Sequence, residues 1–438
     1  MSALAQVHAW RGGRCTGSDR AFDAGERDAI RSALTSAGVE IVPQDGSWPQ
    51  AGCDAMVIST AVEESVPDVQ AARAAGVPLL HRSELLAEFL AGSEGIAVTG
   101  TSGKSTTTAM VTEILLNAEL DPTVITGGAL VSLEEDGLLG NACAGTGPHL
   151  VIEADESDGS VVRYHPWASV ILNLQRDHKE PAEVLDMFKA LVAQTRGPVI
   201  LGDDPALDPL SAGAIRAGLT PECDVRAVDI ELAPNGSRFR IDDVVFMLPA
   251  PGEHNIRDAV AATAVALEAG VSLEFCAEAL GDFRGVARRH QVVGTARGVT
   301  VIDDFAHNPD KLRASLAAAH LSGGRVLAFF QPHGYGPTRF LFDDLVAAFA
   351  DALTPDDVLW LPPIYYAGGT VTRDVESTDL TAGVRKAGRD ARDMADRDEL
   401  SLAVAAEAQP GDVCMIMGAR DPGLSDLARS VVTALEQG

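Results

Sequence analysis

Residues 98–108 read VTGTSGKSTTT, and this stretch decides the fold class of the chain. It overlaps the run GIAVTG (95–100), which is typical of a buried strand, and it leads into a helix predicted over 104–118. Glycines between a strand and a helix let the backbone approach a ligand closely, and the first N–H groups of the helix form an anion site. Lys104 adds a positive charge for the β- and γ-phosphates of a nucleotide. We therefore predict a phosphate-binding loop within an α/β fold.

One position departs from the strict phosphate-loop pattern. That pattern has a glycine five residues before its Gly-Lys pair, where this chain has Val98. The alternative is a turn rich in Gly, Ser and Thr that caps an ordinary helix, and the strand before it together with the helix after it favours the nucleotide site. The residues expected to hold the nucleotide are Gly100, Thr101, Ser102, Gly103, Lys104, Ser105 and Thr106.

The composition of the 438 residues is that of a multidomain α/β enzyme. Apolar residues make up 46% of the chain, which excludes a disordered protein. The formal net charge of −29 disfavours binding to nucleic acid or to anionic membranes, so an anionic substrate needs a local positive site. The six cysteines form no CxxC pair, and no apolar run of about 18 residues could span a bilayer. We expect a cytoplasmic protein that acts on small molecules, as a monomer or a homodimer.

Alternating strand and helix patterns divide the chain into three blocks. Residues 1–92 show a βαβ rhythm, which predicts a parallel sheet. Residues 93–290 contain the glycine loop, several strand patterns, a less regular segment over 198–250 and a helix-rich end. Residues 291–438 repeat the rhythm with the strand patterns VTVIDDF, RVLAFFQ, DVLWLPP and DVCMIMG. We predict three α/β domains with these bounds.

Two polar segments follow strand patterns of the middle block. NLQRDHKE contains His178, and VIEADESDGS contains four carboxylates, those of Glu153, Asp155, Glu156 and Asp158. The carboxyl ends of parallel strands line a ligand crevice. Four carboxylates there repel one another unless a cation neutralises some of them, and Mg²⁺ is the expected cation beside a phosphate loop. The alternative is a solvated acidic turn and a histidine that caps a strand.

Three more polar motifs lie downstream. PGEHNIRDA begins a helix, and FRGVARRH places paired arginines at a domain boundary. Such a pair suits an anionic ligand in a cleft between domains, and the alternative is a solvated surface pair. IDDFAHNPDKL clusters polar side chains between a strand and a helix, namely Asp303, Asp304, His307 and Asn308.

The order of these motifs resembles that of the Mur ligase family. The chain has GTSGKSTTT, EADESD, NLQRDH, HN at a helix start, FRGVARRH, DDFAHNP, FQPH and MGA in that order, over nearly its whole length. The family carries the shorter GxxGK loop, which accounts for Val98. The resemblance implies a Rossmann-like N-terminal domain for a UDP substrate, a central P-loop ATPase domain and a Rossmann-like C-terminal domain.

The resemblance implies an ATP-dependent ligase that forms an amide bond through an acyl phosphate. The carboxylate of UDP-N-acetylmuramate attacks the γ-phosphate of ATP, and an amino acid of the L-alanine type then displaces phosphate, as a step of peptidoglycan precursor synthesis. ATP and Mg²⁺ are the implied cofactors. A site divided between domains also implies that the third domain closes on the second before chemistry.

The resemblance assigns roles to individual residues. The implied catalytic residues are Lys104, Glu156, His178 and Arg289. The implied ligands of Mg²⁺ are Ser105, Thr106, Glu156 and His178. Asn255 is implied to contact adenine, Asp304 the ribose and Arg289 the γ-phosphate. The implied contacts of the incoming amine are His307, His333, Arg339 and Arg420.

Three departures from the family pattern bear on the substrates. Gly334 and Pro337 occupy places where members that use L-alanine have arginines able to bind a carboxylate, so the acceptor differs or Arg339 and Arg420 replace them. Asp258 replaces the second asparagine of the HNxxN motif. Relatives also have a strand and a glycine loop ahead of the residue equivalent to Met1, so we expect residues 1–92 to lack both.

Alternative functions stay open at this point. One is a ligase with the same chemistry but a different acceptor or carboxylate substrate, such as a murein peptide or the substrate of a paralogue. A P-loop GTPase or regulatory ATPase is disfavoured because the chain has no NKxD motif. A non-catalytic nucleotide-binding protein is disfavoured because Lys104, Glu156, His178 and Arg289 are all present.

Overall fold

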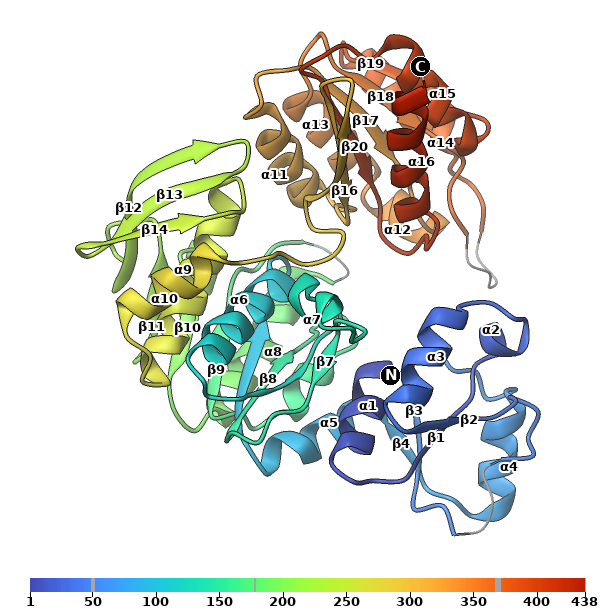
Figure 1. Cartoon of the computed structure of the whole chain (residues 1–438), viewed down its shortest axis with the longest axis vertical. Coiled ribbons are helices and arrows are strands. Elements are labelled where there is room, and N and C mark those ends of the chain that lie inside the picture. Colours follow the sequence, from blue (N-terminus) through green and yellow to red (C-terminus); the bar gives the residue numbers. More distant parts are fainter. Residues whose placement is uncertain (49–51, 177–178, 367–371, 438) are drawn as a thin grey trace. The chain divides into compact units, whose positions relative to one another are not determined.

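The computed structural model describes residues 1–48, 52–176, 179–366 and 372–437. It confirms the α/β class (Figure 1). The contacts within the chain divide it into two compact units. The first unit contains Met1–Val228, Phe239–Phe246 and Ile256–Val286. The second contains Asp229–Arg238, Met247–Asn255 and Ala287–Gly438. The finer division into three domains stays a prediction.

The N-terminal segment contains short strands in parallel pairs. Its strands are β1 (Cys15–Gly17), β2 (Val39–Ile41), β3 (Met56–Ile58) and β4 (Leu79–His81). Its helices are α1 (Ser2–Trp10), α2 (Arg20–Asp23), α3 (Asp28–Ser36), α4 (Pro67–Ala75) and α5 (Arg82–Ala91). β1 pairs with β2 and β3 with β4, both in parallel, so the predicted direction is confirmed, although among the described residues the four strands form two separate sheets.

A ten-stranded sheet forms the centre of the next segment, in the order β14-β13-β12-β11-β10-β9-β5-β8-β6-β7. Its strands are β5 (Glu94–Thr99), β6 (Thr123–Ile125), β7 (Ala142–Cys143), β8 (His149–Glu153), β9 (Ala168–Ile171), β10 (Val199–Gly202), β11 (Ile215–Gly218), β12 (Val225–Ala233), β13 (Gly236–Ile241) and β14 (Val244–Leu248). The strand that enters the glycine loop, β5, is parallel to both of its neighbours, β8 and β9.

Helices follow or separate these strands. They are α6 (Lys104–Asn117), α7 (Val131–Glu135), α8 (Pro181–Gln194), α9 (Glu253–Glu268) and α10 (Leu273–Gly281), with short 3-10 helices η1 (Ser160–Arg163) and η2 (Pro205–Leu210). Leu4 and Val7 of α1 belong to the same buried cluster as Leu90 of α5 and Ile152 of β8. The N-terminal helix therefore shares a hydrophobic core with the large sheet.

The expectation of a less regular segment over 198–250 was wrong, because this stretch forms β10 to β14. In β13, Ser237, Phe239 and Ile241 are buried and alternate with less buried residues, which is the pattern of a strand with one covered face. These strands are joined by turns such as residues 234–235 between β12 and β13. The turn residues dominate the local composition, and they obscured the strand pattern in the sequence.

A six-stranded sheet forms the core of the C-terminal segment, in the order β15-β16-β20-β17-β18-β19. Its strands are β15 (Gln291–Ala296), β16 (Val299–Asp304), β17 (Val326–Phe330), β18 (Val358–Leu361), β19 (Asp390–Asp393) and β20 (Val413–Met417). β15 is antiparallel to β16, and the other strand pairs are parallel. The four strands predicted here are confirmed as β16, β17, β18 and β20.

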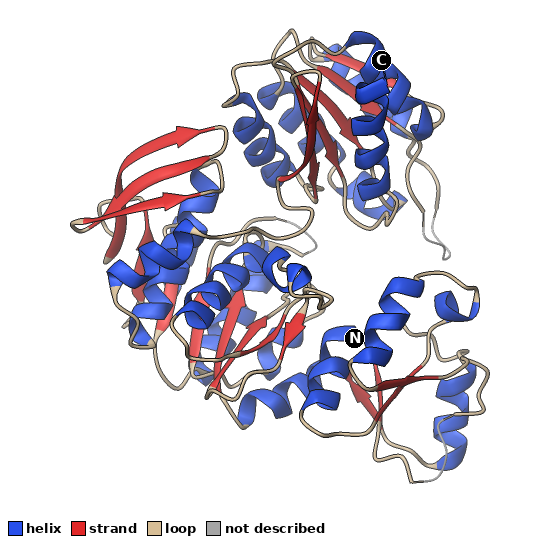
Figure 2. Cartoon of the chain, in the orientation of Figure 1, coloured by secondary structure: helices blue, strands red, loops and turns tan. Residues whose placement is uncertain are grey.

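Helices cover both faces of this sheet, as Figure 2 shows. They are α11 (Pro309–His320), α12 (Tyr335–Phe340), α13 (Phe342–Ala352), α14 (Ser377–Lys386), α15 (Leu400–Glu407) and α16 (Leu424–Gln437), with the 3-10 helix η3 (Arg397–Glu399). Ala328 and Phe330 of β17 pack in one buried cluster with α11, α13 and α14. Leu327 and Phe329 point to the opposite face, toward α15 and α16.

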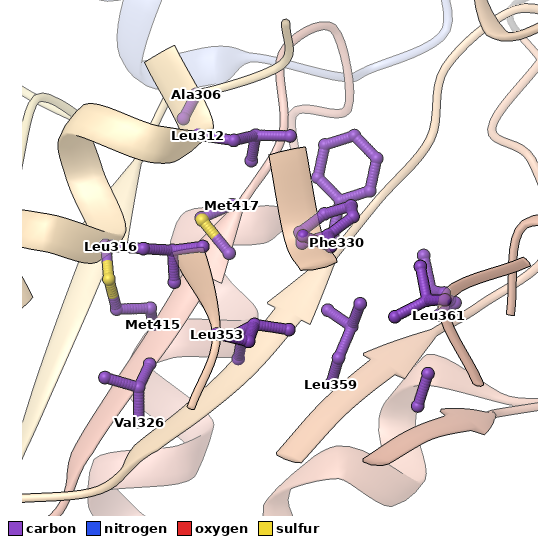
Figure 3. Packing of buried hydrophobic residues seen from close by; sticks show 14 of the residues in the cluster. Ala306, Leu312, Leu316, Val326, Phe330, Leu353, Leu359, Leu361, Met415 and Met417 are labelled. Carbon is purple, nitrogen blue, oxygen red and sulfur yellow. The ribbon is translucent and has the colours of Figure 1, made fainter. Parts of the chain in front are cut away.

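The first of these clusters fixes the position of α11 on the sheet. Figure 3 shows Leu312 and Leu316 of α11 beside Met417 and Met415 of β20. All four side chains are fully buried.

In the described part of the chain, no helix combines the length and the apolar character that a bilayer crossing requires.

Candidate functional site

The phosphate loop connects the end of β5 to the first turn of α6. Gly100 and Gly103 both have a positive φ, 135° and 86°. A β-carbon on Gly100 would lie 3.0 Å from the Cβ of Leu172, and one on Gly103 would clash with the carboxylate of Asp258 in α9. Both glycines are therefore required by the backbone conformation and by close packing.

Asn173, which follows β9, holds the loop in this conformation. Its Oδ1 accepts hydrogen bonds from the Thr101 hydroxyl and from the Ser102 amide, both at 2.8 Å. Its Nδ2 donates to the Ser102 carbonyl at 3.1 Å. Asn173 was not among the predicted site residues, although its position just beyond a strand of a parallel sheet was a usable signal.

Lys104 lies at the start of α6 with its ammonium group at the loop. Its Nζ donates to the Gly100 carbonyl at 2.7 Å and to Glu156 Oε2 at 2.8 Å. Burial disfavours the charged form, but the carboxylates of Glu156, Asp155 and Glu153 outweigh it and raise the pKa of Lys104. The structure thus brings together two of the predicted catalytic residues and keeps a fixed positive charge at the loop.

The carboxylate that meets Ser105 is that of Glu153 at the end of β8. The Ser105 hydroxyl lies 3.1 Å from each Glu153 oxygen. Glu153 Oε2 also accepts hydrogen bonds from the Thr126 hydroxyl at 2.9 Å and from the Gly127 amide at 3.0 Å. The resemblance implies Glu156 as the carboxylate that binds Mg²⁺ together with Ser105, and this stays a prediction. In the structure, the Ser105 hydroxyl contacts the carboxylate of Glu153.

Oxygen ligands of this kind suit Mg²⁺, because a hydroxyl and a carboxylate are hard donors. Thr106, another predicted ligand, is buried in the same helical turn as Ser105. His178 lies outside the described residues. Among the described residues, no group of three or more His, Cys, Asp or Glu side chains has the arrangement of a metal site.

A salt bridge positions the acidic segment that follows β8. Arg82, at the start of α5, approaches Asp158 to 2.6 Å and Asp155 to 3.8 Å. Asp158 also accepts a hydrogen bond from the Ser160 amide at 2.9 Å. Arg82 was not predicted, because no pattern in HRSELL links it to Asp158, which lies 76 positions further along the chain.

The predicted adenine contact, Asn255, lies in the first turn of α9. Its Nδ2 donates to the Pro251 carbonyl at 2.7 Å, and the residue is buried. Three residues later, Asp258 is the side chain against which Gly103 packs. Asp258 was singled out as a departure from the family pattern, and in the structure its carboxylate lies against the phosphate loop at Gly103.

Two predicted substrate residues lie together in the C-terminal unit. β16, β17, β18 and β20 run parallel, so the loops that follow them share one edge of the sheet. His307 and His333 come from two of these loops, and their ring centroids are 5.5 Å apart. Burial, and then the charge of Lys311, holds the pKa of His307 well below its usual range, so its imidazole is neutral. His307 Nδ1 lies 2.9 Å from the Phe305 carbonyl, which can only accept a hydrogen bond.

Asp304 and Arg289 lie near the start of the same unit. The Asp304 carboxylate is buried and accepts hydrogen bonds from the His290 amide, the Ala306 amide and the Ser315 hydroxyl. The guanidinium of Arg289 lies 4.4 Å from the centroid of the Phe305 ring. Their predicted contacts with ribose and γ-phosphate stay predictions.

The remaining predicted substrate residues differ in their surroundings. Arg339 donates to Asp374 Oδ1 and to the Thr372 carbonyl, each at 2.8 Å. Arg420 is exposed after β20. Gly334 has φ 68°, where a larger residue is strained, and a β-carbon there would lie 3.2 Å from Pro337. The backbone conformation at this position therefore favours glycine.

Comparisons with known proteins agree along the chain. Three family models match: "Mur ligase family, catalytic domain" at residues 1–94, "Mur ligase middle domain" at 98–266 and "Mur ligase, glutamate ligase domain" at 288–420. A UDP-N-acetylmuramate–L-alanine ligase of Burkholderia multivorans is 36% identical over 448 residues, which cover 97% of this chain and 93% of the relative. One of Symbiobacterium thermophilum is 37% identical and covers 100% and 92%.

A solved structure has the same fold. The crystal structure of UDP-N-acetylmuramate-alanine ligase MurC from Thermotoga maritima matches with a TM-score of 0.82 and 26% identity. The match covers 100% of this chain and 96% of the other. This chain is therefore similar to that ligase both in sequence and in fold.

Proposed function

This chain belongs to the Mur ligase family, and we propose that it is an ATP-dependent ligase that joins L-alanine to the carboxylate of UDP-N-acetylmuramate. Relatives of that name match nearly the full length of the chain. The observation that carries the proposal is the phosphate loop, where the Lys104 ammonium is fixed between the Gly100 carbonyl and Glu156.

In the proposed first step, a carboxylate oxygen of UDP-N-acetylmuramate attacks the γ-phosphorus of ATP, and the bond from that phosphorus to the β,γ-bridging oxygen breaks. The products are an acyl phosphate and ADP. Lys104 and the first N–H groups of α6 stabilise the negative charge that moves onto the leaving oxygens. Ser105 and Glu153, with Thr106 and His178, would hold Mg²⁺, which supplies further charge neutralisation when it is bound. Asn255, Asp304 and Arg289 are proposed to contact the nucleotide.

In the proposed second step, the amino group of L-alanine attacks the acyl carbon, and inorganic phosphate leaves as the amide bond forms. The attacking nitrogen must lose a proton. His307 suits this role because burial keeps its imidazole neutral and its Nδ1 lies 2.9 Å from the Phe305 carbonyl, which orients the ring. His333, 5.5 Å away ring to ring, completes the proposed amine site.

Phosphate release by the purified protein tests this function. Inorganic phosphate is measured with ATP, Mg²⁺ and UDP-N-acetylmuramate in the presence of each proteinogenic amino acid and of a murein tripeptide. We expect release only when ATP, UDP-N-acetylmuramate and L-alanine are all present, together with a product whose mass corresponds to one added alanine.

Each other result has a defined meaning. Release that requires another amino acid retains the ligase chemistry and contradicts L-alanine as the acceptor. Release that requires the tripeptide favours the murein-peptide alternative. Absence of stimulated release with every acceptor would contradict the ligase function itself.

A further inference from the structure

Two tyrosine rings of the C-terminal unit lie against the guanidinium of Arg373. Tyr335 begins α12, Tyr366 follows β18, and their ring centroids are 5.5 Å apart at an interplanar angle of 65°. The guanidinium of Arg373 lies 4.8 Å from the centroid of Tyr366 and 5.5 Å from that of Tyr335. The rings pack on Ile364 and Val375 in a small buried cluster, so the platform under the guanidinium is fixed.

Arg373 has no anionic partner among the described residues, although its neighbours do. Arg339 pairs with Asp374, the residue next to Arg373. Arg392, which lies 5.7 Å from the ring of Trp360, pairs with both Asp390 and Glu407. The guanidinium of Arg373 therefore presents its N–H groups without a carboxylate or carbonyl from the described chain.

The Tyr366 hydroxyl is a second polar group without a partner. Its oxygen is buried, and within the described ranges it makes no hydrogen bond. Buried hydroxyls are usually satisfied, so an unpaired one on the ring that lies under an unpaired guanidinium indicates a place for a ligand. Both groups are hydrogen-bond donors, and the ligand that suits them is an anion with more than one oxygen.

The position of this platform connects it with the proposed amine site. The Gly334 amide donates to the Tyr365 carbonyl, and the Tyr365 amide donates to the Pro332 carbonyl, both at 2.8 Å. This pairing joins the loop of His333 to the segment that ends in Tyr366. An amino acid has its ammonium and carboxylate on one carbon, so a site that receives the amine near His307 and His333 needs an anion-binding group close by.

From these contacts we propose that Arg373, supported by Tyr335 and Tyr366, binds the carboxylate of the acceptor amino acid and makes the enzyme selective for acceptors with that group free. This assignment rests on the function proposed above. A planar guanidinium on an aromatic face retains its in-plane N–H groups for two parallel hydrogen bonds to a carboxylate. The Tyr366 hydroxyl donates a further bond. The Arg339–Asp374 pair acts beside it as an anchor of the backbone.

Acceptor kinetics of Arg373→Gln and Arg373→Lys test the proposal. The KM values for L-alanine, L-alaninamide and ATP are measured for each variant. Arg392→Gln is the matched control, because it also removes an arginine from an aromatic ring but lies in β19 and pairs with chain carboxylates. We expect Arg373→Gln to raise the KM for L-alanine at least about tenfold, with L-alaninamide and ATP changed less than about twofold. Arg373→Lys should be intermediate, and Tyr366→Phe should raise the KM for L-alanine less than Arg373→Gln.

Two results would overturn the assignment. An unchanged KM for L-alanine in Arg373→Gln shows that the carboxylate is bound elsewhere, and an equal rise for L-alanine and L-alaninamide shows a merely structural role. Saturation-transfer NMR of L-alanine with the wild-type protein and Arg373→Gln gives a readout that does not depend on turnover. Signal in the wild type that is lost in the variant supports the site even if phosphate release fails, and equal signals or none contradict it.

Discussion

At the scale of single residues, Lys104 is the group on which the proposed phosphoryl transfer depends most. We expect Lys104→Ala to lower phosphate release at saturating substrates by at least about 100-fold, as removal of one preorganised donor does in other enzymes. Lys189→Ala is the matched control, since Lys189 makes an exposed ion pair with Asp186 in α8. Because the change leaves Glu156 buried without its cation, thermal unfolding is measured in parallel for Lys104→Ala with and without Glu156→Gln. Turnover near the wild-type rate in a folded Lys104→Ala protein would refute the role of the loop.

The two glutamates beside the loop allow a second prediction at this scale. Glu153 meets the Ser105 hydroxyl, and Glu156 meets the Lys104 ammonium. We expect Glu153→Gln to raise the Mg²⁺ concentration for half-maximal phosphate release at least about tenfold, because an amide oxygen is a weaker ligand than a carboxylate. Glu156→Gln should change that concentration much less. The measurement is a Mg²⁺ titration of phosphate release, and the opposite ranking of the two variants would restore Glu156 as the metal ligand.

Single residues also show what the sequence could and could not predict about the site. The phosphate loop was predictable because glycines, a lysine and a helix start are consecutive in the chain. The choice between Glu153 and Glu156 was not, since both lie within one acidic run and only the direction of each side chain separates them. Arg373 was missed for a related reason, because its two tyrosine neighbours are contributed by separate segments of the chain, one at the start of α12 and one after β18.

At the scale of elements, a histidine at the end of α11 predicts a pH dependence of stability. His320 Nε2 lies 2.9 Å from Asp357 Oδ2, and this carboxylate also accepts from the amides of Val326 and Thr354. The hydrogen bond to Asp357 raises the pKa of His320 above its ordinary value of 6.5. The native state therefore holds the proton more tightly than the unfolded state. The resulting stabilisation is fully present below pH 6.5 and is lost as pH rises through the higher pKa of the folded protein.

Thermal unfolding of His320→Gln at several pH values measures this effect. We expect the variant to lose more Tm relative to the wild type at about pH 5.5 than at about pH 8.5, because glutamine can donate to Asp357 but does not titrate. His165→Gln, at an exposed position, is the matched control for the replacement of a histidine by glutamine. A Tm difference that stays constant across this range would contradict a raised pKa for His320.

The elements themselves were predicted with uneven success. Buried parallel strands such as β17 and β20 are continuous apolar runs, and the sequence predicted them well. β19, which reads DARD, is a polar strand at the edge of its sheet, and β12 to β14 are separated by short turns. These strands therefore lack the continuous apolar run that identifies a buried strand. The pairing of β1 with β2 and of β3 with β4 depends on contacts that a local pattern does not contain.

At the scale of the whole molecule, the formal net charge of −29 predicts a dependence of stability on salt. Excess like charge destabilises a compact chain through self-repulsion, and salt screens it, since the Debye length falls from about 30 Å at 0.01 M to about 10 Å at 0.1 M. We expect the Tm to rise as KCl increases from about 20 mM to about 200 mM. A variant with Glu222→Lys, Glu278→Lys and Glu436→Lys, all at exposed positions, should respond less to KCl.

Comparison with an uncharged osmolyte separates screening from general stabilisation. Sucrose at the same osmolality leaves charge repulsion in place, so it should raise the Tm of the wild type and of the triple-lysine variant equally. KCl should instead raise the Tm of the wild type more. Equal responses of the two proteins to KCl would contradict the prediction, because they would show that the net charge does not destabilise the folded state. Local ion pairs such as Lys104–Glu156 would then make the main electrostatic contribution to stability.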